Sequence, residues 1–232
     1  MLVIGFPAAA FGTNCFVVAQ AAREECLVID PGIGVVDRLE AVLSEHSLKP
    51  AAVLLTHGHI DHIYSVPPVC DAHAVAAHVH AADRYRLKDA LSQLDPQLTA
   101  MLGPQFSSVA TWHDPDELVE FVDGAELSLA GLTVRVVHAP GHTEGSVLFG
   151  IDGVPEGVGE DSGLSRTLFS GDVLFAGSVG RTDLPGGSDE VMRRTLREVV
   201  LAQPDDTLVL PGHGPATTIG HERSGNPFLQ SL

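Results

Sequence analysis

The amino-acid sequence predicts an α/β protein in which two β-sheets pack face to face and helices cover their outer sides. Short segments with strand character occur in two groups along the chain, and each group is followed by segments with helical periodicity. Hydrophobic residues make up 44% of the sequence, which is enough for a substantial core. Ala51–Leu55 is a continuous apolar run, the pattern of a strand that is buried on both faces.

The first half of the chain begins with strands and continues with a helix. Asp30-Pro31-Gly32 ends the third predicted strand, and apolar residues from Val35 to Leu43 then follow the 3.6-residue period of a helix that ends before Pro50. The strands predicted in this half are Leu2–Phe6, Cys15–Ala19, Cys26–Ile29, Ala51–Leu55 and Val75–His78.

The second half returns to a strand pattern. Leu132, Val134 and Val136 alternate in the sequence, so we expect them to share the buried face of one strand. A last helix begins at Ser188 and ends before Pro204. The strands predicted in this half are Glu126–Leu129, Leu132–His138, Ser146–Gly150, Thr167–Ser170 and Thr207–Leu210.

We expect residues 1–232 to form a single domain, because chains of 232 residues commonly do so. Residues 83–115 are predicted to be a helical insertion that covers the substrate, with Asp83 as the N-cap of its first helix. Residues 151–166 contain four glycines and four acidic residues and are expected to form a flexible surface loop.

Composition excludes several classes of function. The formal net charge is −17, so polyanions are repelled at long range and no nucleic-acid partner is expected. No apolar run reaches the length of a membrane helix, and no membrane association is expected. The first basic residue is Arg23, so the chain lacks the basic start of a signal peptide and a cytoplasmic location is expected.

The segment His57-x-His59-x-Asp61-His62 carries the strongest chemical signal. It places four potential metal ligands within six residues, directly after a predicted buried strand. Three unpaired imidazoles would be costly to bury there, whereas a divalent metal binds both neutral imidazole and carboxylate. The segment therefore predicts a metal site.

Three later motifs each place a potential ligand next to a glycine, at or near the end of a predicted strand. Their ligands are His142, Asp172 and His213. In this order and together with the histidine segment, they resemble the signature of the metallo-β-lactamase superfamily, and the resemblance extends over nearly the whole chain. It implies an α/β fold of the four-layer αββα metallo-β-lactamase sandwich type.

The resemblance also implies a ligand set for two divalent metal ions, zinc by expectation, with iron or manganese also possible. The first metal would be bound by His57, His59 and His142. The second would be bound by Asp61, His62 and His213, and Asp172 would bridge the two ions.

Within the superfamily, three segments resemble the glyoxalase II-like hydrolases (hydroxyacylglutathione hydrolases). They are Asp30–Gly32, Gly177–Pro185 and Asn226–Leu229. Long-form glyoxalase II enzymes add a C-terminal helical domain that grips glutathione, but only nineteen residues follow His213, and that domain is not expected here. The implied substrate is a small acyl-thiol, such as S-lactoylglutathione, with the carrier left open.

Three further residues are candidates for supporting or substrate-binding roles. Asp30 either orients a metal-bound histidine or is a plain turn carboxylate. Arg181 either holds a substrate carboxylate or pairs with Asp183. His138 is expected to support the site from a neighbouring strand.

The expected chemistry is thioester hydrolysis. Two adjacent cations lower the pKa of a shared water from about 15.7 toward roughly 7, and the resulting hydroxide attacks the carbonyl carbon. Asp61 is the candidate catalytic residue, because it would both bind its metal and orient this nucleophile. A thiolate leaves without obligatory protonation, so no dedicated general acid is needed.

The sequence also leaves room for different functions. An iron-dependent persulfide dioxygenase would carry the same motifs, with His57, His142 and Asp172 as its two-histidine, one-carboxylate iron site. A lactonase, a β-lactamase or a non-catalytic metal-binding protein would also be compatible with the ligand motifs. The oligomeric state is not predicted.

Overall fold

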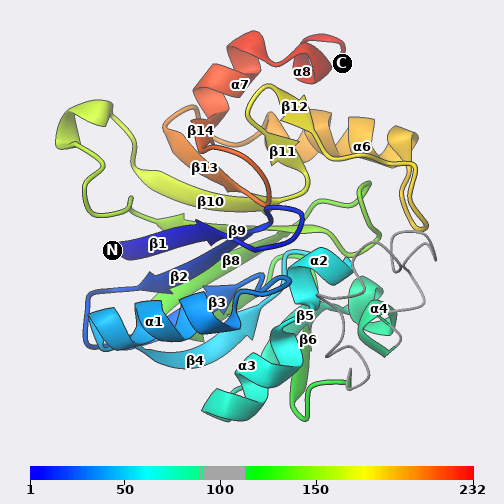
Figure 1. The fold of residues 1–232 in the computed structure, drawn as a ribbon. Helices are drawn as coiled ribbons and strands as arrows, with labels where there is room; N and C mark the ends of the chain where they lie inside the picture. The colour runs from blue at the N-terminus through cyan, green and yellow to red at the C-terminus, as the bar shows by residue number, and fades with distance from the viewer. Residues whose placement is uncertain (89, 91–112) are drawn as a thin grey trace.

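Two six-stranded sheets lie face to face in the computed structural model, and helices cover the outer side of each sheet (Figure 1). The structure describes residues 1–88, 90 and 113–232. Helices α1 and α3 lie against the first sheet, and helices α6, α7 and α8 lie against the second (Figure 1). The four-layer αββα sandwich predicted from the sequence is therefore confirmed.

The first sheet has the strand order β1-β2-β3-β4-β5-β6. Its first three strands are antiparallel, and β3 to β6 run parallel. The strands are β1 (Leu2–Pro7), β2 (Asn14–Ala19), β3 (Glu25–Ile29), β4 (Lys49–Leu54), β5 (Ala77–His80) and β6 (Leu118–Phe121). The helices that follow them are α1 (Val36–His46), α2 (Ile60–Ile63), α3 (Val66–His73), the 3₁₀ turn η1 (Ala81–Asp83) and α4 (Arg84–Lys88).

The second sheet has the order β14-β13-β10-β9-β8-β7, and only β10 and β13 are a parallel pair. Its strands are β7 (Glu126–Leu129), β8 (Leu132–His138), β9 (Val147–Asp152), β10 (Arg166–Gly171), β13 (Thr207–Pro211) and β14 (Thr217–Thr218). The other elements are the turn η4 (Glu160–Ser162), the hairpin of β11 (Leu174–Phe175) and β12 (Ser178–Val179), and the helices α6 (Asp189–Thr195), η5 (Leu196–Val200), α7 (Ile219–Gly225) and α8 (Pro227–Gln230).

The core lies in three apolar layers because successive strand residues point to opposite faces. In β2, Val17 packs toward the helix layer, whereas Phe16 and Val18 pack toward the second sheet. The Phe16 ring meets Phe169 of β10 edge-on, with ring centroids 5.2 Å apart. A strand that is buried on both faces appears in the sequence as a continuous apolar run, so such strands were predicted correctly.

The structure departs from the sequence predictions at the insertion. Strand β5 begins at Ala77, two residues later than predicted. Asp83 ends the turn η1 and directly precedes α4, and its buried carboxylate accepts hydrogen bonds from distant loops and from the Arg86 side chain. Most of the predicted insertion lies outside the described residues.

Two smaller differences concern elements that lack a clear sequence pattern. Strand β6 and helices α2 and α3 were not predicted, because each is short and its apolar residues show no extended period. Between β9 and β10, the predicted surface loop is shorter than expected and contains the turn η4.

Candidate metal centre

The predicted ligands come together at one edge of the sandwich, from loops that follow strands of both sheets. His57 and His59 follow β4, and His142 lies in the connection from β8 to β9. Asp172 follows β10 and His213 follows β13; because these strands are parallel, their carboxyl ends lie at the same edge. The remaining ligands, Asp61 and His62, are on the short helix α2.

The first group consists of His57, His59 and His142. His59 Nδ1 lies 3.1 Å from His57 Nε2 and 2.8 Å from His142 Nε2. The other ring nitrogen of His142, Nδ1, lies 2.7 Å from the carbonyl oxygen of Arg181, so Nδ1 carries the proton and donates it. The lone pair of His142 Nε2 therefore points into the group, as a metal ligand requires.

The second group consists of Asp61, His62 and His213. His213 Nε2 lies 3.3 Å from Asp61 Oδ2, and His62 Nε2 lies 3.6 Å from the same oxygen. His62 Nδ1 lies 2.9 Å from Asp30 Oδ2 and donates to it, which leaves the lone pair of Nε2 free to point inward. This group therefore also presents its donor atoms to one point.

Asp172 lies between the two groups. Its Oδ1 is 3.3 Å from His62 Nε2, and its Oδ2 is 3.5 Å from His213 Nε2 and 3.6 Å from His142 Nε2. It contacts histidines of both groups, which is the position that the family resemblance implied for a bridging carboxylate.

Two buried atoms show that this donor set fits metal ions. His62 Nε2 and Asp172 Oδ1 are both buried and lie 3.3 Å apart, but neither makes a hydrogen bond of good geometry. Leaving such atoms without a hydrogen bond costs about 1–3 kcal/mol each, and more for charged groups. Divalent cations bound by imidazole nitrogen and carboxylate oxygen would satisfy both atoms. The residues thus suit two cations, with His57, His59 and His142 around one and Asp61, His62 and His213 around the other.

Burial and neighbouring charges set the protonation of the ligands. Burial, followed by the adjacent His142, lowers the pKa of His59 to about 3, and burial likewise lowers the pKa of His57. Although burial alone would raise the pKa of Asp172, the neighbouring His62 lowers it overall. These three ligands are therefore held in the neutral-imidazole and carboxylate forms that bind metals.

His62 is different, because carboxylates surround it. Burial alone would lower its pKa, but Asp172, Asp61 and Asp30 together raise that pKa above its usual value. The pKa of His213 is also raised, chiefly by its hydrogen bond with Asp61 and by Asp172. Metal binding to the second group therefore competes with protonation of these two histidines.

Asp30 supports the second group directly. It is buried, its Oδ2 contacts His62, and it also accepts hydrogen bonds from the backbone N–H (2.8 Å) and hydroxyl (2.6 Å) of Thr56. The interpretation of Asp30 as the partner of a ligand histidine therefore agrees with its contacts. Gly212 allows the chain beside His213 to pack closely against Asp172, because a Cβ at position 212 would lie 2.3 Å from Asp172 Oδ1.

The side chains of Arg181 and His138 lie outside the two groups of candidate ligands. The Arg181 guanidinium forms a two-pronged, exposed ion pair with Asp183, whereas its carbonyl oxygen holds His142. His138 stacks on His80 with ring centroids 4.2 Å apart, and its Nε2 lies 2.7 Å from the Glu144 carbonyl oxygen. It therefore contacts the loop that carries His142, and no ligand side chain in the described part of the chain.

Thr13 is a site residue that the sequence analysis missed. It lies between β1 and β2, is fully buried, and pairs through its backbone with His213. Its hydroxyl donates a 2.8 Å hydrogen bond to Asp61 Oδ2. A lone threonine beside Gly12 carries no sequence signal for this role, so only the fold reveals it.

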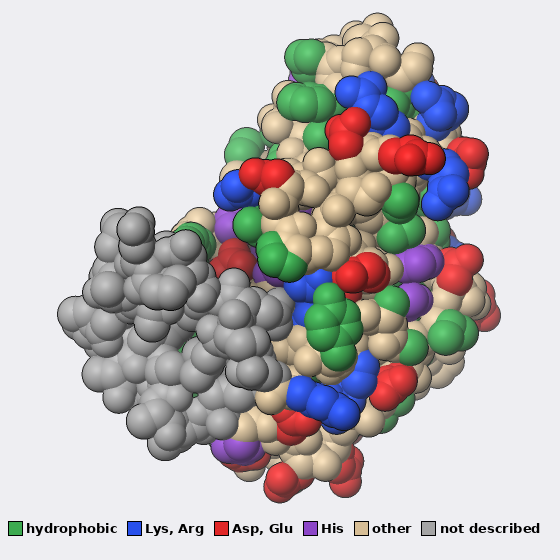
Figure 2. Space-filling view, turned by 90° about the vertical axis from the view of Figure 1, so that its right-hand side faces the viewer, with side chains coloured by type: hydrophobic (Ala, Val, Ile, Leu, Met, Phe, Trp, Pro, Cys, Tyr) green, Lys and Arg blue, Asp and Glu red, His purple; other side chains and the backbone are tan. Residues whose placement is uncertain are grey.

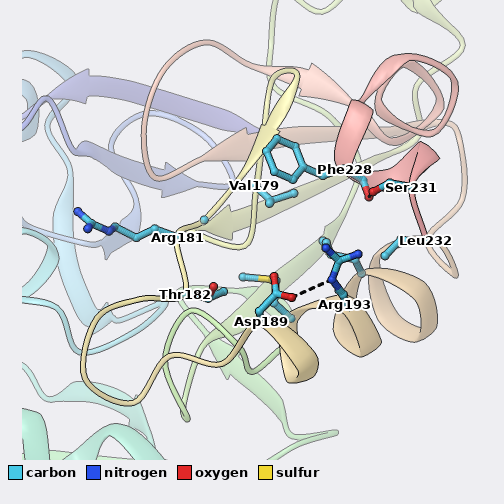
Figure 3. Close-up of a pocket in the computed structure, with 11 residues that line it drawn as sticks. Val179, Arg181, Thr182, Asp189, Arg193, Phe228, Ser231 and Leu232 are labelled. Atoms are coloured by element: carbon cyan, nitrogen blue, oxygen red, sulfur yellow. Dashed lines mark hydrogen bonds and ion pairs between the residues drawn. The ribbon is translucent and has the colours of Figure 1, made fainter.

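A pocket of about 300 Å³ lies between the β11–β12 hairpin, α6 and α8, and no candidate ligand lines it. Gly180 forms part of its wall, and a Cβ on Gly180 would lie 1.7 Å from the Asp172 carbonyl oxygen, so the chain at Gly180 packs against the loop that carries Asp172. Figure 3 shows the Arg181 side chain directed away from Phe228 and Leu232, which lie across the pocket.

The surface around this region carries charges of both signs. Figure 2 shows basic and acidic side chains interspersed on one face of the molecule, with histidines among them.

Among the described residues, no helix is long and apolar enough to cross a membrane.

The sequence profile described as the metallo-beta-lactamase superfamily matches residues 8–154 and 155–213. The chain belongs to this superfamily. Its ligand groups and four-layer fold agree with that membership, and the superfamily, one of metal-dependent hydrolases, supports hydrolase activity.

Relatives match the chain over all or nearly all of its length. A Mycobacterium tuberculosis protein described as uncharacterized is 42% identical over 100% of this chain and 99% of its own length. The Haemophilus influenzae protein named hydroxyacylglutathione hydrolase GloC is 31% identical, over 97% of this chain and 96% of its own.

Two solved structures share the fold and about a third of the sequence. BLEG-1, described as a B3 metallo-beta-lactamase, superposes with a TM-score of 0.77 and 33% identity, over 98% of this chain and 99% of its own. TTHA1623, described in a di-iron-bound form, gives a TM-score of 0.73 and 32% identity, over 97% and 100%.

Proposed function

We propose that this hydrolase cleaves thioesters of the S-lactoylglutathione type at a centre that holds two divalent metal ions, with zinc as the expected metal. The observation that carries the two-metal site is the position of Asp172 between two histidine-rich groups of donor atoms. The relationship to a protein named hydroxyacylglutathione hydrolase, over nearly the whole chain, supports the thioester substrate.

The residues around the centre suit a reaction without a separate proton donor. When bound by these residues, two metal ions would supply a hydroxide at neutral pH and would stabilise negative charge on the substrate oxygen. Thr13 donates to Asp61 Oδ2 and thereby holds the orientation of this carboxylate, which supports the role of Asp61 beside the nucleophile. Asp61 is ionised, because His62 and the hydrogen bonds from His213 and Thr13 lower its pKa even though burial raises it.

The leaving group then decides the substrate class. The acidic and imidazole groups of the described centre would be engaged as ligands or are held by hydrogen bonds, so they are poorly placed to protonate a departing alcohol or amine. A thiol has a pKa of about 8.5, so it departs as a thiolate without that proton. The shortage of proton donors therefore favours thioesters over ordinary esters and amides.

β-Lactam hydrolysis is the second candidate, because BLEG-1 shares a third of the sequence and is described as a B3 metallo-beta-lactamase. An iron-dependent persulfide dioxygenase is a third candidate. The structure groups His57, His62 and Asp172 within reach of one ion, so two histidines and a carboxylate are available for iron, although the set differs from the predicted one by His62 in place of His142.

One experiment separates these functions. The protein is purified without added metal, its zinc, iron and manganese are quantified per chain, and S-lactoylglutathione, a chromogenic cephalosporin and a persulfide are tested as substrates. We expect about two metals per chain and turnover of the thioester. Equimolar iron with thiol-dependent oxygen uptake would establish the dioxygenase instead, and rapid cephalosporin cleavage would establish the β-lactamase.

A further inference from the structure

Asp83 carries a buried carboxylate that has no part in the ligand set. It ends the turn η1 after strand β5 and is fully buried. Its Oδ2 accepts hydrogen bonds from the Gly58 N–H at 2.8 Å and the Thr143 hydroxyl at 2.7 Å. Its Oδ1 accepts from the Gly145 N–H at 2.8 Å and from Arg86 Nε at 3.3 Å. Because a carboxylate offers about four acceptor positions, this one is saturated.

Three of these four donors belong to the two loops that carry the first metal group, and the fourth, Arg86, lies on α4. Gly58 is the residue between His57 and His59, and Thr143 directly follows His142. Asp83 therefore joins the loop that provides two ligands to the loop that provides the third, although Gly58 and Thr143 are 25 and 60 residues away from it in the chain.

The packing around Asp83 requires both loops to lie close to it. A Cβ on Gly145 would lie 2.6 Å from the Asp83 carboxyl carbon, and a Cβ on Gly58 would lie 2.8 Å from Arg86 Cβ. The Arg86 guanidinium is nearly fully buried and donates to Glu144 at 2.7 Å and to the Pro185 carbonyl at 2.8 Å. The negative charge of Asp83 is thus paired, and its backbone contacts hold the loops at short distance.

We infer that Asp83 is the positioning residue for the metal group formed by His57, His59 and His142. Asp30 is its counterpart in the second group, but the two act differently. Asp30 contacts the imidazole of His62 directly, whereas Asp83 contacts the backbone and the threonine beside the ligands, and also Arg86. The inference rests on the proposed two-metal site and concerns metal binding rather than substrate.

Asp83→Asn is the primary test, measured on the full-length protein without substrate. An amide nitrogen cannot accept hydrogen bonds, so in either orientation of the side chain some donors of the two loops lose their acceptor. We expect the zinc affinity of one site to fall by about 10- to 100-fold while the second site keeps its affinity, as is typical of residues that orient metal ligands. Competition with a chromophoric zinc chelator measures both affinities, and cobalt(II) spectra show which site has changed.

Glu222→Gln is the matched control. Glu222 is also fully buried and accepts hydrogen bonds from the Gly177 N–H, the Thr217 hydroxyl and the Asn226 amide, none of which is next to a ligand. The control is expected to lower the melting temperature while both zinc affinities stay within about twofold of the original protein. Unchanged zinc affinities in Asp83→Asn, or an equal loss at both sites, would overturn the inference.

A second pair of variants serves if Asp83→Asn does not fold. Thr143→Val removes the hydroxyl donor and keeps the shape of the side chain, whereas Thr143→Ser keeps the donor. We expect weaker zinc binding at one site in Thr143→Val and recovery in Thr143→Ser; equal affinities in the two variants would contradict the positioning role. If the unmodified protein binds two metals without cleaving thioesters, the proposed function fails while this inference stands.

Discussion

His62 Nδ1 donates to Asp30 Oδ2 across 2.9 Å, and both side chains are buried. This contact holds the His62 ring so that Nε2 faces Asp172 and Asp61. Asp30 has a backbone φ of +50°, a conformation that L-residues rarely adopt, and in this conformation its carboxylate lies next to the His62 ring. The chain therefore accepts local strain at the residue that orients a ligand.

Asp30→Asn is predicted to weaken the second metal group. An amide cannot accept hydrogen bonds on its nitrogen, so it cannot serve Thr56 and His62 together as the carboxylate does. We expect metal affinity or activity to fall by about 10- to 100-fold, measured by chelator competition and by turnover of the thioester. Asp123→Asn is the control, because Asp123 is exposed and accepts the backbone N–H of His138, away from the ligands. Equal effects of the two variants would contradict this role of Asp30.

Asp172→Ala is predicted to remove the link between the two groups. It eliminates the carboxylate that lies within 3.6 Å of His62, His142 and His213, so the protein should lose metal from both groups or nearly all activity. Metal content per chain and the turnover number measure the effect. Retention of two metals with full activity would refute the bridging position of Asp172.

Thr13→Val is predicted to lower turnover and, to a smaller extent, stability. The valine keeps the buried shape of Thr13 but removes the hydroxyl that donates to Asp61. A hydrogen bond to a charged group contributes about 1.5–3 kcal/mol, which corresponds to a factor of about 10 to 150, so kcat is expected to fall by about tenfold or more. Thr13→Ser keeps the hydroxyl and should retain most of the activity. If both variants were equally active, the hydroxyl would have no role.

Metal affinity is predicted to fall as the pH is lowered. The pKa values of His62 and His213 are raised by the surrounding carboxylates, so below these values both imidazoles hold protons that a metal must displace. Above them the imidazoles are neutral and the affinity reaches its plateau. Chelator competition over a pH series measures the curve. An affinity independent of pH down to mildly acidic conditions would contradict the assignment of these residues as ligands.

Much of the fold and of the ligand set was predictable from the sequence. The strands of both sheets have apolar residues on one or both faces, so their pattern is visible over short windows. The ligands could be predicted because metal binding requires particular side chains, and the segment from His57 to His62 concentrates four of them. The insertion after β5 was predicted less well, because Asp83 has the residue type of a helix cap but makes its hydrogen bonds to distant loops.

By itself, the sequence determined most of the order of strands and longer helices and the residue types of the candidate metal ligands, because both depend on side-chain chemistry along a short stretch of chain. Only the tertiary structure decided how these ligands are held. Thr13 donates a hydrogen bond to Asp61, which is 48 residues away in the sequence, and the Arg181 carbonyl accepts one from His142, which is 39 residues away. Such contacts follow from the packing of two sheets, and a backbone carbonyl or a single hydroxyl leaves no pattern that a sequence can show.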